Sequence, residues 1–437
     1  MKRTLEKLLL DWQKDLDHKP ILLRGARQVG KSYLVDSVGQ TFVSYVTINF
    51  DLDESFSRIF EQDKNPERII RDLSLATGKR INPGKTLLFL DEIQECPNAI
   101  RALRYFYEKM PKLHVIGAGS LVDFTLEKIG IPVGRVEMLN LYPMSFAEFL
   151  QAKEKDLLIE ELARHDPGKG LPEIAHNQLL RLYWEYMAVG GMPEAIAKWL
   201  QTSDIKKVKK VHRSLISTYQ QDFAKYTNRF QEKYVDLVYS SVPRLTGNKF
   251  IFASINADLK ARELRPALEL LQKAAVVHAV THTSSGGVPL AGESNPLFFK
   301  VIMSDIGLMQ TMLNIDTGRW ILQQEQVATN FRAVVEAFVG QEMLAYAPAD
   351  QKKELFYWAR QKRGSTAEVD YVTEIKDQVI PIEVKAGKSY ALKSMELFLN
   401  EKQHSPYGIH FSPKNFGFKS KIRQFPLYAV RKALVQE

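Results

Sequence analysis

The sequence predicts an α/β fold whose first third holds a parallel β-sheet covered by helices. Three short apolar runs indicate buried strands, and they lie at residues 20–24, 86–90 and 113–116. Short, almost wholly apolar strands are typical of parallel sheets, because helices cover both faces of such sheets. A further run at residues 42–50 is rich in β-branched and aromatic residues, which also favours a strand. Polar segments with helical spacing separate the runs, as in alternating strand–helix units.

A glycine-rich segment follows the first run directly. It reads Gly-Ala-Arg-Gln-Val-Gly-Lys-Ser, and its spacing is that of a phosphate-binding loop rather than of an ordinary glycine-rich turn, which is the alternative. In such a loop backbone N–H groups surround a phosphate, the lysine reaches the β- and γ-phosphates, and the hydroxyl ligates Mg²⁺. We therefore expect ATP to bind at Gly25, Ala26, Arg27, Gln28, Val29, Gly30, Lys31 and Ser32.

An acid pair, Asp91 and Glu92, ends the run at residues 86–90. The carboxyl ends of parallel strands form the edge at which α/β sheets bind ligands. There Asp91 can join Ser32 in holding Mg²⁺, and Glu92 can orient and deprotonate an attacking water. The sequence thus predicts ATP hydrolysis with Lys31 and Glu92 as catalytic residues. Two solvated acids at a strand end are the alternative.

Two more polar residues are candidates for this site. The run at residues 113–116 leads into Gly117-Ala-Gly-Ser120, so Ser120 lies where it can contact the γ-phosphate or the water, unless the segment is a simple turn. Arg135 follows Gly134 and can stabilise transition-state charge, in cis or from a neighbouring subunit. A solvent-facing arginine is equally compatible with the sequence.

The order of these motifs resembles a family of bacterial and archaeal AAA-type ATPases. Members read Gly-x-Arg-Gln-x-Gly-Lys-Ser/Thr, Leu-Asp-Glu-Ile-Gln, a Gly-Ser turn, Gly-Arg and Pro-x-Ser-Phe-x-Glu, which stand here at residues 25–32, 90–94, 119–120, 134–135 and 143–148. The resemblance covers about the first third of the chain. It implies an AAA-type P-loop core that uses ATP and Mg²⁺ and often self-assembles. It also implies a C-terminal region of unknown function whose end is nuclease-like.

The middle of the chain is helical and charge-rich up to about residue 235. A basic run there is either a solvated helix face or a nucleic-acid contact, and it comprises Lys206, Lys207, Lys209, Lys210 and Arg213. Beyond it, residues 257–259 and 263–273 indicate helices, and residues 276–280 a strand that turns back at 283–287. This is the order of a winged helix, and the resemblance supports it.

Winged helices serve both in DNA binding and in protein contacts, and the sequence is compatible with either use. In DNA binders the second helix enters the major groove. Lys260, Arg262 and Arg265 lie at or just before the start of that helix.

The last third resembles the PD-(D/E)xK nucleases. Their signature, an acid, a Glu-x-Lys on the adjacent strand and a helical Glu upstream, matches Asp370, Glu383, Lys385 and Glu336. A two-residue turn between the strands would place Asp370 on the face that holds Glu383, whereas a three-residue turn without a bulge would not. Aligned carboxylates can hold a second Mg²⁺ or Mn²⁺. A hairpin with an exposed polar face is the alternative, and the nuclease fold often persists after its activity is lost.

Composition limits the classes of function. The 437 residues include 45% hydrophobic and 25% charged residues, and no apolar run approaches the length of a membrane helix, so we expect no membrane partner. The start of the chain favours an amphipathic helix over a signal peptide. A single cysteine, Cys96, excludes an internal disulfide and favours a reducing cytoplasm. The net charge of +9 permits nucleic-acid binding, although an inert basic surface fits as well.

These observations predict four regions. They are an AAA-type ATPase core at residues 1–150, a helical lid or linker at 151–235, a winged-helix-like region at 236–320, and an α/β nuclease-like domain at 321–437. We expect a Mg²⁺-dependent ATPase coupled to a C-terminal half that binds DNA or RNA. Assembly into a homo-oligomer is compatible with this expectation. The alternative is a nucleotide-dependent switch that binds a protein partner and uses an inactive nuclease-like domain as a dock.

Overall fold

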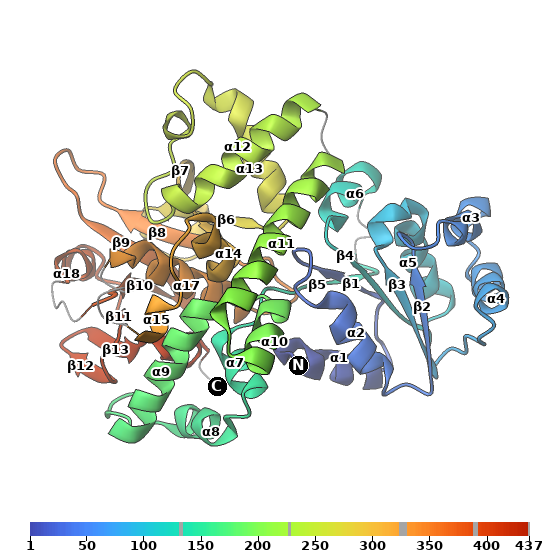
Figure 1. Cartoon of the computed structure of the whole chain (residues 1–437), viewed down its shortest axis with the longest axis horizontal. Coiled ribbons are helices and arrows are strands. Elements are labelled where there is room, and N and C mark those ends of the chain that lie inside the picture. Colours follow the sequence, from blue (N-terminus) through green and yellow to red (C-terminus); the bar gives the residue numbers. More distant parts are fainter. Residues whose placement is uncertain (131–133, 226–228, 323–329, 388–391, 436–437) are drawn as a thin grey trace. The chain divides into compact units, whose positions relative to one another are not determined.

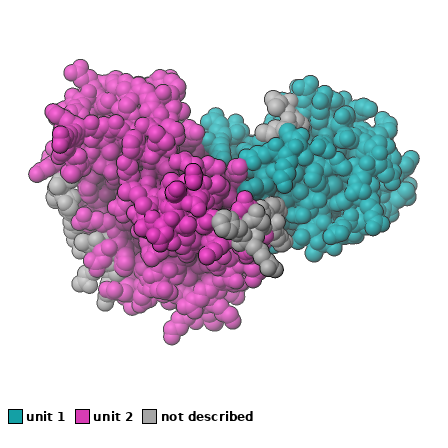
Figure 2. Space-filling view, turned by 90° about the horizontal axis from the view of Figure 1, so that it is seen from above, with its two compact units in different colours: residues 1–142, 348–352 teal, residues 143–347, 353–437 magenta. Residues whose placement is uncertain are grey.

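The computed structural model describes residues 1–130, 134–225, 229–322, 330–387 and 392–435. The chain forms two compact units, coloured separately in Figure 2. The first unit comprises residues 1–142 and 348–352, and the second comprises residues 143–347 and 353–437.

The first unit is built on a sheet of five parallel strands in the order β2-β3-β4-β1-β5. The strands are β1 (Ile21–Arg24), β2 (Ser44–Asn49), β3 (Thr86–Asp91), β4 (His114–Gly119) and β5 (Glu137–Asn140). Every residue of β3 and β4 is buried, as expected for strands covered on both faces. The predicted α/β core with a parallel sheet is therefore confirmed.

Among the described residues of the first unit, six helices pack around this sheet (Figure 1). They are α1 (Thr4–Lys14), α2 (Lys31–Gly39), α3 (Ser55–Gln62), α4 (Pro66–Thr77), α5 (Pro97–Lys109) and α6 (Val122–Ile129). Fully buried residues of α4, α5 and β3, among them Ile69, Leu103 and Leu88, form one apolar core. This packing holds the ends of the strands at fixed positions for the site described below.

The second unit contains a mixed sheet of eight strands in the order β12-β13-β11-β10-β9-β8-β6-β7. Its strands are β6 (Val277–Thr283), β7 (Ser294–Met303), β8 (Leu355–Ala359), β9 (Glu368–Ile375), β10 (Gln378–Val384), β11 (Gly408–Ser412), β12 (Gly417–Lys419) and β13 (Ile422–Pro426). The β6–β7 and β9–β10 pairs are antiparallel, whereas β10–β11 and β11–β13 are parallel. The α/β class thus extends to this unit.

Twelve helices lie among the described residues of the second unit. They are α7 (Phe146–Ala152), α8 (Asp156–Arg164), α9 (Glu173–Val189), α10 (Pro193–Thr202), α11 (Ile205–Lys225), α12 (Arg229–Leu245), α13 (Ala261–Lys273), α14 (Ile306–Met312), α15 (Arg319–Leu322), α17 (Arg332–Ala345), α18 (Lys393–Glu401) and α19 (Val430–Leu434). Helix α17 packs on β7, β8 and β10, and α18 packs on β9 and β10 (Figure 1). Among the described helices, none has the length and apolar character needed to cross a bilayer.

One local prediction for the winged-helix-like region is wrong. Residues 257–259 form a turn rather than a helix, so the helices that precede the β6–β7 hairpin are α12 and α13. The hairpin does not stand alone, because β6 also pairs with β8 in parallel. The strands expected in two separate regions therefore share one sheet. The division of the chain into four regions stays a prediction.

The segment at residues 143–148 belongs to the second unit, where it starts a buried helix. Ser145 and Glu148 cap α7 reciprocally, in a capping box. The Phe146 N–H donates to both carboxylate oxygens of Glu342 on α17, at 2.9 and 3.2 Å. These bonds satisfy N–H groups of the first turn that no helical carbonyl can reach. The segment therefore joins α7 to α17 within the second unit.

Candidate functional site

The loop between β1 and α2 has a backbone that only certain residues tolerate. Gly25 and Gly30 have positive φ angles of 150° and 93°. A Cβ atom on Gly25 would lie 2.1 Å from the carbonyl oxygen of Leu141, so a side chain is excluded there. Gly30 caps α2, whose first-turn N–H groups have no helical partner and can bind an anion. The loop geometry is that expected for holding phosphate.

Lys31 is buried at the start of α2, with 7% of its surface exposed. Its Nζ donates to the carbonyl oxygens of Gly25 and Ala26, at 3.0 and 2.9 Å. Burial lowers the pKa of Lys31 to about 8, although the nearby carboxylates of Glu92 and Asp91 oppose that shift. The ammonium therefore stays mostly charged at neutral pH while it is removed from water. Such a cation can interact strongly with an anionic ligand.

Ser32 and Asp91 meet across the sheet edge. The Ser32 hydroxyl donates to the two carboxylate oxygens of Asp91, at 3.2 and 3.0 Å. Asn49, which pairs with Asp91 in the β2–β3 register, donates from Nδ2 to Asp91 at 3.2 Å. Burial, with the neighbouring Glu92, raises the pKa of Asp91, and the bond from Ser32 opposes this. Hydroxyl, carboxylate and amide oxygens are the ligands that Mg²⁺ prefers, so these residues fit that ion.

Glu92 has a strained backbone and a fixed side chain. Its φ of 48° lies in the left-handed region, which costs a non-glycine residue on the order of 1 kcal/mol. The Gln94 amide donates to the Glu92 carboxylate at 2.6 Å. Gly119 makes room for Gln94, since a Cβ atom there would lie 1.9 Å from Gln94 Oε1. The absence of a side chain at Gly119 thus allows Gln94 to lie where it can bind and position the Glu92 carboxylate.

Ser120 and Arg135 have different surroundings in the structure. Ser120 is buried and directly follows β4, whose Ala118 pairs with Asp91 on β3. Arg135 is about half exposed, and its Nε lies 3.3 Å from Glu108 on α5. The structure therefore places Ser120 at the sheet edge beside the acid strand and places Arg135 in a surface ion pair.

Arg3 and Asn49 belong to the surroundings of the loop but carry no motif. Arg3 is buried, and its guanidinium donates to the carbonyl oxygens of Val29 and Tyr142, at 2.6 and 2.7 Å. Arg3 therefore links the phosphate loop to the segment that follows β5. The only sequence signals were a basic residue at the start of an amphipathic helix, and an asparagine at the end of a strand.

The structure also brings together the four residues of the nuclease-like pattern. The β9–β10 turn consists of Lys376 and Asp377, since Ile375 pairs with Gln378. The β9–β10 pairing ends at Ile382 with Tyr371, and continuing its register by one residue puts Asp370 opposite Glu383. Asp370 Oδ2 accepts from the Val384 N–H at 2.7 Å, and Lys385 forms an ion pair with Glu383. The pairing of β8 with β9 shifts register beside Asp370, between Phe356 and Trp358.

A second lysine lies in this acid cluster. Lys300 on β7 is 1% exposed, and its Nζ lies 3.0 Å from Glu336 and 2.5 Å from Glu368. The surrounding carboxylates of Glu336, Glu368 and Asp370 raise the pKa of Lys300 in spite of its burial. We use the term acid cluster for Lys300 and the residues around it, namely Glu336, Glu368, Asp370, Glu383 and Lys385. Neither Lys300 nor Glu368 belongs to a motif that the sequence shows.

Burial acts on the carboxyl groups of the cluster in the opposite direction. It raises the pKa of Glu336 to about 8 and that of Glu383 to about 7, although Lys300 lowers both. Glu383 Oε2 is buried and has no hydrogen-bond partner among the described residues. Within the described residues, no group of three or more His, Cys, Asp or Glu side chains is placed to hold a metal ion.

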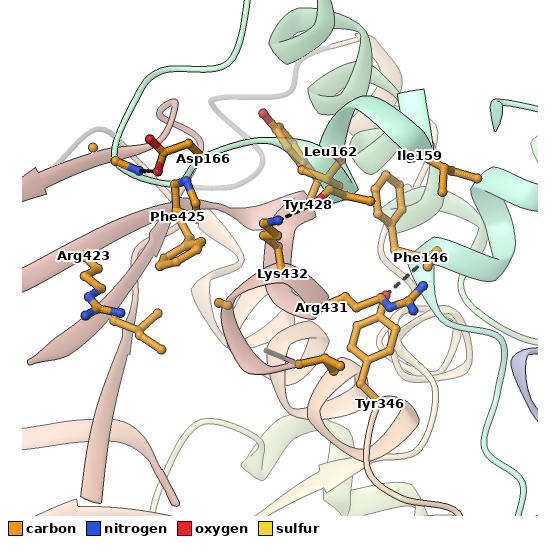
Figure 3. Close-up of a pocket in the computed structure, with 18 of the residues that line it drawn as sticks. Phe146, Ile159, Leu162, Asp166, Tyr346, Arg423, Phe425, Tyr428, Arg431 and Lys432 are labelled. Carbon is orange, nitrogen blue, oxygen red and sulfur yellow. Dashed lines mark hydrogen bonds between the residues drawn. The ribbon is translucent and has the colours of Figure 1, made fainter. Parts of the chain in front are cut away.

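The second unit also has a cavity of about 610 Å³ (Figure 3). Aromatic and aliphatic side chains line most of it, including Phe146, Leu162 and Phe425. Its basic side chains are Arg423, Arg431 and Lys432. Arg423 stacks over the ring of Tyr407, and Lys432 donates to the carbonyl oxygen of Ala163. No residue predicted from the sequence as a site residue lines this cavity.

Comparison with family models covers three segments of the chain. Residues 17–150 match the model described as an AAA domain. Residues 180–319 and 331–430 match two models described as domains of unknown function, DUF8612 and DUF4143. The AAA match spans the phosphate loop, the acid pair and Ser120. The first unit is therefore similar to AAA-type P-loop ATPase domains, as its sheet and loop geometry also indicate.

Comparison with solved structures found matches of low sequence identity. A Walker-type ATPase of Pyrococcus abyssi is 16% identical, with a TM-score of 0.44 over 71% of this chain and 95% of that one. The Aeropyrum pernix ORC1 protein in complex with DNA is 13% identical, with a TM-score of 0.29 over 71% and 90% of the two chains. The CDC6P protein of Pyrobaculum aerophilum is 12% identical, with a TM-score of 0.25 over 73% and 92%. No curated protein matches the sequence.

Proposed function

We propose that the first unit hydrolyses ATP with the help of Mg²⁺. The observation that carries this proposal is the contact of the Ser32 hydroxyl with the Asp91 carboxylate, beside the buried ammonium of Lys31. Three groups that phosphate chemistry needs thus converge at one sheet edge: a cation, a pair of metal ligands and the carboxylate of Glu92. The AAA-domain match over residues 17–150 supports the same activity.

Each residue has a distinct part in the proposed reaction. Lys31 exchanges its two loop carbonyls for phosphate oxygens, and the loop N–H groups bind the same phosphates. Ser32 and Asp91 would hold Mg²⁺, which when bound neutralises phosphate charge. Glu92 orients the attacking water and accepts its proton.

Three neighbouring residues have supporting parts in the same reaction. Gln94 fixes the Glu92 carboxylate. Ser120 contacts the γ-phosphate or the water. Arg135 would exchange its ion pair with Glu108 for the transition-state charge, from the same subunit or from a neighbouring one.

The first experiment separates binding from hydrolysis. Lys31→Ala should abolish binding of a fluorescent ATP analogue, whereas Glu92→Gln should keep binding and lose turnover by roughly a hundredfold or more. Lys7→Ala and Glu61→Gln, at exposed positions of the same unit, serve as matched controls. Hydrolysis at the parent rate by the Glu92 variant would refute the role assigned to that residue.

Arg135 has a matched control in the same ion-pair network. Arg104 also binds Glu108, at 2.9 Å. Arg135→Ala should lower turnover about tenfold or more if the guanidinium reaches the phosphates, while Arg104→Ala should not. If Arg135 acts from a neighbouring subunit, the specific activity should rise with protein concentration, and mixing the Arg135 and Glu92 variants should restore part of it.

For the second unit we propose binding to the phosphate backbone of DNA or RNA. An exposed basic face of α11 supports this, since Lys206, Lys207, Lys210 and Arg213 recur at helical spacing on it. Lys209 differs, because it is partly buried and donates to the carbonyl oxygen of Ile315. A second basic and exposed group lies at the start of α13, with Lys260, Arg262 and Arg265.

ATPase rates with and without nucleic acid test this second proposal. If phosphate contacts carry the binding, DNA or RNA should stimulate turnover, and affinity should fall steeply with salt. Reversing Lys206, Lys207 and Lys210 to Glu should remove the effect, whereas the same reversal at Lys7 should not. A flat response to every nucleic acid would favour the other candidate function, a nucleotide-dependent switch for a protein partner.

A further inference from the structure

The acid cluster of the second unit concentrates negative charge, and lysine residues of the same unit lie beside it. Glu336, Glu368, Asp370 and Glu383 bring four carboxyl groups together from α17, β9 and β10. Carboxylates that share a partly buried site repel one another unless cations or protons neutralise them. In the PD-(D/E)xK nucleases, which the last third of the chain resembles, the cation would be a divalent metal ion.

Lys300 already supplies a cation inside this cluster. It lies on β7, and its Nζ contacts Glu336 at 3.0 Å and Glu368 at 2.5 Å. The ring of Tyr357 lies 5.2 Å from the same ammonium, which adds a cation–π contact. Only 2% of the Lys300 side chain is exposed, so water does not compete for its charge. The ammonium is thus held by two elements, α17 and β9, and is covered by β8.

Other groups near the cluster also contribute to its charge balance. Lys385 pairs with Glu383, and Asp370 accepts the backbone N–H of Val384. His410, opposite Glu383 on β11, has its pKa lowered to about 4 by burial and by Lys385, so it adds no charge. Two ammonium groups therefore contact three of the four carboxyl groups, and a backbone N–H binds the fourth.

We propose that Lys300 is the resident cation of the acid cluster and takes the place of a divalent metal ion. The cluster then joins α17 to the sheet as an ion network and performs no metal-dependent cleavage. A divalent ion would have to lie beside a buried ammonium, and the two would repel each other. Each of the four carboxyl groups already has one oxygen engaged with Lys300, with Lys385 or with a backbone N–H. This inference is independent of ATP hydrolysis in the first unit.

Removing Lys300 would free carboxylate oxygens near one that already has no partner in the part of the chain that the structure describes. Glu383 Oε2 is buried and has no hydrogen-bond partner among the described residues, and Glu383 faces Asp370 in the register. Without the ammonium, the oxygens of Glu336 and Glu368 that now contact it would be free, beside Glu383 Oε2, and the cluster would carry an excess of negative charge. Oxygen ligands of this kind suit Mg²⁺ and Mn²⁺. Lys300→Met should therefore create a metal site in place of the ion network.

The test measures Mn²⁺ binding to the full chain without nucleotide, by electron paramagnetic resonance and by thermal unfolding. The parent protein and Asp370→Asn should bind the same amount of Mn²⁺, because any ion held by the first unit is common to both. Lys300→Met should melt at a lower temperature in EDTA, recover with Mn²⁺ and bind about one more ion. Adding Asp370→Asn and Glu383→Gln to it should remove that ion.

Lys249→Met is the matched control, because Lys249 pairs with Lys300 across a bridge but is exposed over the ring of Phe298. It should change neither Mn²⁺ binding nor its effect on melting. Greater Mn²⁺ binding by the parent protein than by Asp370→Asn would overturn the proposal. So would Mn²⁺-dependent cleavage of DNA or RNA that is lost in Asp370→Asn and kept in Lys31→Ala. If Lys300→Met does not fold, the comparison of Mn²⁺ binding by the parent protein and by Asp370→Asn still tests the proposal.

A folded Lys300→Met that binds no additional Mn²⁺ would also overturn the proposal, because the ammonium would then not be what excludes the metal. The ATPase rate of Lys300→Met gives an independent reading. Turnover at the parent rate shows that the first unit is intact, so a failure of the proposed ATPase and a failure of this inference remain distinguishable.

Discussion

Both units hold carboxylates and a buried lysine at a sheet, yet the two arrangements differ in what the lysine contacts. In the first unit Lys31 donates to the carbonyl oxygens of its own loop, and the Asp91 carboxylate contacts Ser32 and Asn49 instead. In the second unit Lys300 contacts the carboxylates directly. A lysine that contacts only neutral carbonyls keeps charge available for a phosphate, whereas one paired with carboxylates has used it.

The pKa shifts of the two lysines reflect this difference in what each ammonium contacts. Burial lowers the pKa of Lys31 to about 8, since the nearby carboxylates compensate only in part. For Lys300 the carboxylates more than offset the burial and raise its pKa. The first ammonium is therefore poised to gain from an anionic ligand, and the second is already stabilised by the fold.

The largest expected effect comes from removing one carboxylate in each unit. Asp91→Asn should lower ATP turnover by roughly a hundredfold to a thousandfold, because it removes a metal ligand at the site of charge development. Asp370→Asn should leave turnover within about twofold of the parent. A steady-state ATPase assay at saturating Mg²⁺ compares them. Equal losses in both variants would mean that the two sites are not independent.

Replacing each lysine by methionine should affect stability differently. Lys300→Met leaves buried carboxylates without their cation, which should lower the free energy of unfolding by about 3–5 kcal/mol. Lys31→Met removes a charge that burial already disfavours, so its effect should lie within about 1 kcal/mol. Urea denaturation followed by circular dichroism measures both. A larger loss for Lys31→Met would contradict the contrast drawn between the two lysines.

The pH dependence of stability should also differ between the units. Burial raises the pKa of Glu342 to about 8 and that of Glu383 to about 7, from an ordinary value of 4.5. In that range the folded state binds more protons than the unfolded state, so stability should fall as the pH rises from about 5 to about 8. Each such carboxyl contributes a slope of at most about 1.4 kcal/mol per pH unit. Lys31, whose pKa is lowered, predicts the opposite trend for the first unit between pH 8 and 10.5.

Glu342→Gln isolates one part of this dependence. The amide oxygen can still accept the Phe146 N–H, but the side chain no longer titrates. The variant should flatten the fall in stability up to pH 8, whereas Glu160→Gln, at an exposed position, should not. Tryptophan fluorescence suits the measurement, because Trp184, Trp199, Trp320 and Trp358 all lie in the second unit. An unchanged slope would show that the fold does not hold Glu342 protonated.

The sequence predicted the fold of the first unit well because its signals are local. The phosphate loop, the acid pair and the Gly-Ser turn are short contiguous motifs, each at the end of a predicted strand. Their meeting at one edge follows from the parallel order of the strands. Asn49 and Arg3 were missed because they act from elements that carry no motif. Only the register of β2 with β3, and the path of the N-terminal segment, bring them to the site.

The second unit was less predictable because its key contacts are not local. Asp370 and Glu383 could be paired only once the turn was known, and Lys376-Asp377 is not a strong turn signal although both residues take positive φ angles. Lys300 lies far from Glu368 in the sequence, on a strand whose place in the sheet depends on the pairing of β6 with β8. That pairing also joins strands that the sequence assigned to different regions.

A smaller effect should follow from Gly119→Ala. The new Cβ atom would meet Gln94 Oε1, so the Gln94 amide would have to release the Glu92 carboxylate. Turnover should fall about tenfold while nucleotide binding is kept, since the loop itself is untouched. Gly287→Ala, where no atom lies within 4 Å of the new Cβ, is the matched control. A normal rate in the Gly119 variant would show that Gln94 is not needed to position Glu92.

The smallest effect should come from Arg3→Ala, which tests whether the phosphate loop needs support from outside its own sequence. The variant loses the bonds from the guanidinium to the carbonyl oxygens of Val29 and Tyr142, so the loop should become less well ordered for ATP. We expect KM for ATP to rise about threefold to tenfold with kcat little changed, because the chemical groups stay in place. Lys2→Ala, at the exposed neighbouring position, should leave both constants unchanged. A fall in kcat without a change in KM would instead place Arg3 with the residues that act on the transition state, and the contrast between a locally encoded site and its distant support would then fail.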